Sequence, residues 1–120
     1  MNPRPLRVPD FLFHILEATQ RIQAYTSGMQ EQDFLANQLV QDAVIRNIEI
    51  MGEASRNIEM HDPQFVSKYP QIPLRKIYLM RNQLIHGYVT VNASLVWATV
   101  HRDIPTLRTA VQQVYDTLIQ

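Results

Sequence analysis

Residues 38–60 decide the fold of this chain, and they read QLVQDAVIRNIEIMGEASRNIEM. Their apolar and small residues recur at steps of three and four, so one stripe of a helix would carry Val40, Val44, Ile48, Met51, Ser55 and Ile58. The opposite side of that helix would carry Asp42, Arg46, Glu49, Glu53 and Arg56. This period predicts one long helix, from about Gln38 to Met60, that buries its apolar stripe against other helices.

The segment before the long helix has the same helical period. Asp10 is expected to cap a first helix that runs to about Thr26, and Gly28 follows as a stop signal. A short turn through residues 30–35 then leads into the long helix. The N-terminal half of the chain therefore predicts two helices joined by a short connection.

The segment after the long helix is divided by proline and glycine. Residues 62–69 predict a short helix, because Asp62 can cap it and a proline follows in its first turn. Pro73 then opens a helix that is expected to run to about His86 and to end at Gly87. Residues 89–93 are expected to form a loop.

The C-terminal part predicts a last helical region that reaches Leu118. Asn92 can cap its start, and Pro105 should kink or restart it with Asp103 as a second cap. Short connections between amphipathic helices favour antiparallel neighbours. We therefore expect an all-α fold, an up-and-down bundle of four main helices with short extra helices, in which residues 1–120 form a single domain.

The composition excludes several classes of protein. The 120 residues are 46% hydrophobic and 18% charged, which is typical of a folded domain and too apolar for a disordered chain. Cysteine is absent, which excludes disulfides, thiolate zinc sites and a cysteine nucleophile. No stretch has the length of a membrane span or the pattern of a signal peptide. We expect a cytoplasmic protein with no membrane contact.

The charges are balanced in number but not in position. Eleven basic and eleven acidic residues give a formal net charge of zero, which argues against a protein that coats nucleic acid with a uniformly basic surface. Residues 63–102, however, contain no acid and hold five basic residues: Lys68, Arg75, Lys76, Arg81 and Arg102. This cationic segment could bind phosphate, or it could be a chance cluster on a solvated face.

Three residues near the end of the predicted 73–86 helix could carry chemistry. Arg81 falls within the apolar arc of that helix, so it needs an acidic or carbonyl partner, such as Glu49 or Glu53, or a second protein surface. Asn82 and His86 would be neighbours four residues apart. Together they offer a phosphate-binding arginine, an orienting amide and a proton-transfer imidazole, which is a plausible set for cleaving a phosphodiester. The alternative for His86 is a helix-capping role in the last turn.

The same helix also limits what one copy of the chain could do. Arg81 and His86 would point about 140° apart on an ideal helix, so two copies facing each other would be needed to complete the site. His14, His61 and His101 show no metal-ligand spacing with His86, and the chain has no glycine-rich phosphate loop. We therefore expect no metal and no cofactor.

Several motifs in order resemble one family. They are residues 50–54 (Ile-Met-Gly-Glu-Ala), 72–73 (Ile-Pro), 80–88 (Met-Arg-Asn-Gln-Leu-Ile-His-Gly-Tyr), 96–97 (Val-Trp) and 103–105 (Asp-Ile-Pro). Together they resemble the HepT-like ribonucleases, the toxin halves of bacterial and archaeal HEPN/MNT toxin-antitoxin pairs. The family signature is an arginine, a polar residue after it, a histidine five positions beyond the arginine and a tyrosine two further on. Here these are Arg81, Asn82, His86 and Tyr88.

This resemblance implies an all-helical HEPN fold, a homodimer whose two copies of Arg81 and His86 line a shared cleft, and metal-independent cleavage of RNA. It also implies an antitoxin partner, a minimal nucleotidyltransferase that silences the toxin by attaching AMP to Tyr88. Two other interpretations stay open. The chain could be a catalytically silent helical binding subunit of a nucleotidyltransferase complex, or a plain helical dimerisation module.

Overall fold

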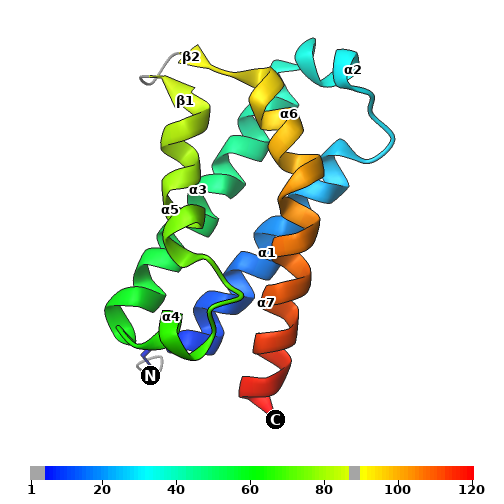
Figure 1. Ribbon diagram of the computed structural model, residues 1–120. Helices are drawn as coiled ribbons and strands as arrows, with labels where there is room; N and C mark the ends of the chain where they lie inside the picture. Colours follow the sequence, from blue (N-terminus) through cyan, green and yellow to red (C-terminus); the bar gives the residue numbers. More distant parts are fainter. Residues whose placement is uncertain (1–4, 87–89) are drawn as a thin grey trace.

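The computed structural model describes residues 5–86 and 90–120, and its chain forms an all-α bundle, as predicted (Figure 1). The main helices are α1 (Val8–Thr26), α3 (Gln38–His61), α5 (Leu74–Leu84), α6 (Ala93–Arg102) and α7 (Ile104–Ile119). The short ones are α2 (Glu31–Leu35) and α4 (Phe65–Lys68). Two strands of two residues each, β1 (Ile85–His86) and β2 (Thr90–Val91), lie between α5 and α6. No helix in the described ranges is long and apolar enough to cross a membrane.

The long helix α3 lies at the centre of the bundle, as its stripe predicts. It packs against α1 on one side and α5 on the other, while α7 packs against α1 (Figure 1). Val44, Ile48, Met51 and Ile58 are all fully buried, whereas the charged residues of the other side are exposed or half-buried. Burying such a stripe is the main favourable contribution to the stability of a helix in a bundle.

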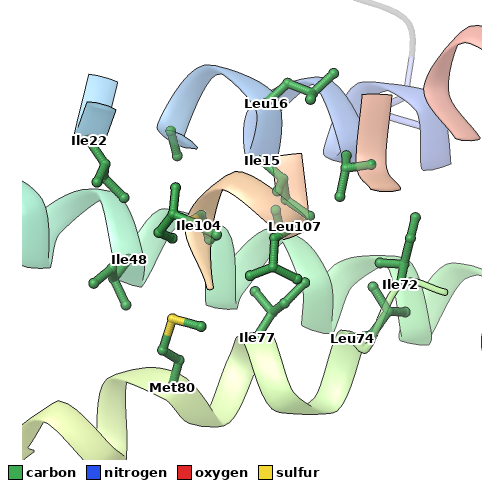
Figure 2. Packing of buried hydrophobic residues seen from close by; sticks show 14 of the residues in the cluster. Ile15, Leu16, Ile22, Ile48, Ile72, Leu74, Ile77, Met80, Ile104 and Leu107 are labelled. Atoms are coloured by element: carbon green, nitrogen blue, oxygen red, sulfur yellow. The ribbon is translucent and has the colours of Figure 1, made fainter. Parts of the chain in front are cut away.

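The core is made by apolar side chains from all five main helices. Figure 2 shows Ile77 and Met80 of α5 projecting toward the interior, where Ile15 of α1 and Leu107 of α7 also lie. Ile72 and Leu74 close the core at the start of α5. This row of buried residues fixes which side of α5 faces inward and therefore which side carries its polar residues.

A glycine allows α3 and α5 to approach closely. A Cβ atom at Gly52 would lie 3.3 Å from the Cα of Tyr78 and 3.4 Å from its carbonyl oxygen. An alanine here would require the α5 backbone to give by a few tenths of an ångström, and a larger side chain would require more. Glycine inside a helix costs about 0.5–1 kcal/mol relative to alanine, and the close approach of the two helices explains its presence.

The helix ends agree with the sequence prediction at some positions and differ at others. Asn92 caps α6 as predicted, since its side chain accepts a hydrogen bond from the Leu95 N–H at 3.1 Å. Asp10 does not occupy the cap of α1; it lies three residues inside, and its carboxylate accepts the N–H of Arg7 at 2.8 Å. Asp103 takes the cap position of α7 without a side-chain cap bond.

The prediction that α5 runs to His86 was wrong. The helix ends at Leu84, Ile85 adopts extended angles (φ −121°, ψ 125°), and β1 pairs antiparallel with β2. The register joins Ile85 to Val91 and His86 to Thr90, and the Asn92 N–H donates to the Leu84 carbonyl at 2.9 Å. Residues 90–91, expected in a loop, are therefore a strand. The β-branched residues at positions 85 and 89–91 favour strand over helix. The pairing of Ile85 with Val91 was not predicted, because a helical period does not indicate which residues pair in a sheet.

Candidate functional site

Arg81 lies on the side of α5 that faces the charged side of α3. Its guanidinium Nε is 3.8 Å from Oε1 of Glu49, which confirms the acidic partner that its position predicts. The Arg81 side chain is 45% exposed, so it lies at the edge of the apolar arc and not beneath it. An exposed ion pair of this kind contributes about 0–1 kcal/mol to stability. The guanidinium is therefore accessible to an anion from solvent.

Two adjoining hollows lie on the surface between the charged side of α3 and α5. We call them together the α3–α5 groove. The first has a volume of about 470 Å³ and is lined by Arg46, Glu49, Gly52, Glu53, Arg56, Asn57, Met60, Tyr78 and Arg81. The second, of about 400 Å³, is lined by Arg56, Glu59, Met60, Pro63, Arg75 and Tyr78. The two hollows adjoin, since Arg56, Met60 and Tyr78 line both of them, and Arg81 lines only the first.

His86 is positioned by a strand pair and not by a helix. Its backbone follows Leu84, the last residue of α5, by two positions and pairs with Thr90. The helical spacing from which the Asn82–His86 contact was predicted does not hold, because Asn82 lies on α5 and His86 lies beyond its end. The helix-dipole argument for His86 and the angle of about 140° to Arg81 rested on a helical backbone at residue 86, which α5 does not provide. Tyr88 lies outside the described residues.

The cationic segment is paired in space with acids from outside it. Lys68 contacts Asp62 at 3.4 Å, Arg75 contacts Glu59 at 3.5 Å, and Lys76 contacts Asp103 at 3.9 Å. Arg102 also bonds Asp103, and this hydrogen bond raises the pKa of the Arg102 guanidinium. With the Arg81–Glu49 pair, all five cations of residues 63–102 have an acidic neighbour. The sequence cluster is therefore a set of ion pairs whose cations are exposed, so a phosphate can reach these cations from solvent.

The structure adds one residue to the candidate set. Tyr78 was not among the residues predicted for the site, yet it is 37% exposed and lines both hollows of the groove. Its position three residues after Arg75 and three before Arg81 was the available signal, because this spacing puts the three side chains on one stripe. Trp97, in contrast, packs against a buried ring, since the centroid of its ring lies 5.5 Å from that of Phe34.

Within residues 5–86 and 90–120, no group of three or more acidic or histidine side chains has the arrangement of a metal site.

Comparison with known proteins points to one family. A family model described as "Ribonuclease HepT-like" matches residues 15–114. The chain is 42% identical over 99 residues to "Probable ribonuclease HepT" of Thermococcus cleftensis, an overlap of 82% of this chain and 87% of that protein. It is 36% identical over 107 residues to "Putative RNase MJ1380" of Methanocaldococcus jannaschii, an overlap of 89% and 95%.

A longer relative from the same archaeon is also similar. "Gamma-glutamylcyclotransferase and putative RNase MJ0434" is 41% identical over 108 residues, which are 90% of this chain but 47% of that protein. The chain thus spans about half the length of this relative. No solved structure matches the chain significantly.

Proposed function

The chain belongs to the HepT-like ribonuclease family, and on that premise we propose that it is a metal-independent RNA endonuclease, the toxin of a toxin-antitoxin pair. The observation that carries the proposal is the family match over residues 15–114, which includes Arg81, Asn82 and His86. The accessible guanidinium of Arg81, which lines the first hollow of the groove, supports it. We propose that the activity is cytoplasmic, because its RNA substrate and the ATP used by the proposed partner enzyme are both found in the cytoplasm.

The chemistry follows from the residue types. The 2′-hydroxyl of the substrate attacks the adjacent phosphorus, the bond from phosphorus to the 5′-oxygen breaks, and the products carry a 2′,3′-cyclic phosphate and a 5′-hydroxyl. His86 transfers protons between the attacking and leaving oxygens, which contributes roughly 10²–10⁴-fold to the rate. Arg81 binds the phosphate and stabilises the charge that develops on it. Asn82, exposed on the same turn as Arg81, orients the substrate.

The test is RNA cleavage by the purified protein and by His86→Ala. Wild type should cleave RNA in the presence of EDTA and leave 2′,3′-cyclic phosphate ends, while His86→Ala should lose at least about a hundredfold in rate. His61→Ala, an exposed histidine at the end of α3, is the matched control and should cleave normally. Activity abolished by EDTA, or full activity in His86→Ala, would overturn the mechanism.

The proposed active form is a homodimer in which both chains supply residues to one cleft. Mixing Arg81→Ala with His86→Ala should then restore part of the cleavage that each variant lacks alone. A cleaving monomer at micromolar concentration would contradict the dimer.

The proposed regulator is a minimal nucleotidyltransferase that attaches AMP to Tyr88. The ester would bring a phosphate close to Arg81 and block the substrate phosphate by charge and by bulk. Tyr88→Phe should cleave RNA but resist silencing by the partner enzyme and ATP, and mass spectrometry should find AMP on Tyr88 of the wild type only. If the wild type binds the nucleotidyltransferase but never cleaves RNA, the alternative holds, a catalytically silent binding subunit.

A further inference from the structure

Tyr78 is a large aromatic side chain that α5 keeps in contact with solvent. It lies between Arg75 and Arg81 at steps of three residues, so one stripe of α5 carries guanidinium, ring and guanidinium in turn. The two arginines are about 9 Å apart along the helix axis. Met60, 67% exposed, lines the same hollows from the α3 side.

The backbone of Tyr78 is fixed by the closest contact between the two helices. Gly52 leaves room for the Tyr78 Cα and carbonyl oxygen directly against α3. The ring therefore extends from a rigid part of α5 into the α3–α5 groove, where both hollows include it. A ring on a rigid support is suited to stacking, because little conformational freedom is lost when a partner binds.

The cations of the groove are held loosely. Arg75 pairs with Glu59 at 3.5 Å and Arg81 with Glu49 at 3.8 Å, and the two arginine side chains are 74% and 45% exposed. Such pairs are weak in water, and phosphate offers a guanidinium the same bidentate geometry as a carboxylate. Arg46 and Arg56 line the α3 side, so the groove holds four arginines and three glutamates.

We propose that the α3–α5 groove is a subsite for single-stranded RNA next to the cleavage position, in which Tyr78 stacks on one base while Arg75 and Arg81 bind the phosphates on either side of it. The inference rests on the proposed ribonuclease function and specifies its substrate. Single strands are required because bases in a duplex are already stacked and their faces are covered. Exposed guanidiniums on either side of one aromatic ring match the alternation of phosphates and bases along a single strand, so we favour a nucleic-acid occupant over a second protein chain.

The experiment measures RNA binding separately from cleavage. A fluorescein-labelled single-stranded RNA is titrated, by fluorescence anisotropy, with His86→Ala protein, in which the RNA should stay intact, and then with the same protein carrying Tyr78→Leu or Tyr78→Phe. Leucine keeps the apolar volume and removes the aromatic face, and phenylalanine keeps that face. Tyr25→Leu is the matched control, since Tyr25 is 41% exposed on α1 and does not line the groove.

We expect Tyr78→Leu to weaken binding roughly tenfold, while Tyr78→Phe and Tyr25→Leu stay within about twofold of the parent. The same RNA annealed to its complement should bind more weakly, and that binding should not change with Tyr78→Leu. Equal binding by Tyr78→Leu, or equal loss on duplex RNA, would overturn the subsite. A change of oligomeric state in Tyr78→Leu would overturn it too, because the face would then be a protein interface. If the protein binds RNA as expected but wild type never cleaves it, the proposed nuclease function fails and the subsite stands.

Discussion

The two halves of the candidate site are built in different ways. Arg81 and Asn82 lie on α5, whose inner side is buried in the core and whose backbone touches α3 at Gly52. His86 lies on β1, a strand of two residues held by its pairing with β2 and by the bond from Asn92 to Leu84. The half proposed to bind phosphate therefore depends on the packing of the bundle, and the half proposed to transfer protons depends on a few backbone hydrogen bonds. Substitutions in the two halves should affect stability and activity in different proportions.

Arg81→Lys should have the largest effect of the substitutions that separate activity from stability. We expect roughly a hundredfold loss of cleavage, because an ammonium ion cannot reproduce the two parallel hydrogen bonds of a guanidinium to a phosphate. The midpoint of thermal unfolding should stay nearly unchanged, because the Glu49 pair is exposed. Single-turnover cleavage and thermal unfolding are the two measurements.

The control is Arg21→Lys, whose ion pair is matched to that of Arg81. Arg21 lies 3.8 Å from Glu17 and is 46% exposed, values almost identical to those of the Arg81–Glu49 pair. Arg21→Lys should change neither activity nor stability. A loss of several kcal/mol in Arg81→Ala would show that Arg81 is structural, and near-normal cleavage by Arg81→Lys would show that its fork geometry is not used.

Gly52→Val tests the packing on which the helical half depends. The new side chain would meet the Tyr78 backbone, so we expect a loss of about 1–3 kcal/mol in the free energy of unfolding. Cleavage at a temperature where the variant is still folded should also fall, because α5 carries Arg81. Asp42→Val, at an exposed position of α3, controls for the helix propensity of valine. A Gly52→Val protein as stable as the wild type would contradict the close approach of α3 and α5.

Local patterns predicted most of the fold but only part of the site. The stripe of α3 and the cap at Asn92 follow from spacing along one helix. The position of Arg81 in the apolar arc of its helix predicted that it needs a partner such as Glu49 or Glu53. The end of α5 does not follow from such spacing, because Ile85 leaves the helix to pair with Val91, six residues away. The close approach of α3 and α5 at Gly52 was not predicted either, because the distance between two helices depends on which of their sides meet. The candidate site includes residues of α5, whose helical period is visible in the sequence, and of β1, whose pairing with β2 is not. The prediction failed where α5 ends and β1 begins.

The smallest expected effect comes from Asn92, which joins the strand pair to α6. Its side chain accepts the Leu95 N–H at 3.1 Å, and its own N–H donates to the Leu84 carbonyl at 2.9 Å. Asn37 caps α3 with the same geometry, accepting the Val40 N–H at 3.1 Å, far from β1 in the chain.

Asn92→Ala and Asn37→Ala should each lose about 1 kcal/mol of stability, the usual value of a helix cap. Only Asn92→Ala should also slow cleavage, by a few fold, because loss of the cap loosens the residue that ties β2 to the end of α5. Asn92→Asp, which restores a capping oxygen, should recover the rate. If the two alanine variants cleave RNA equally well at matched stability, the cap of α6 does not help to position His86.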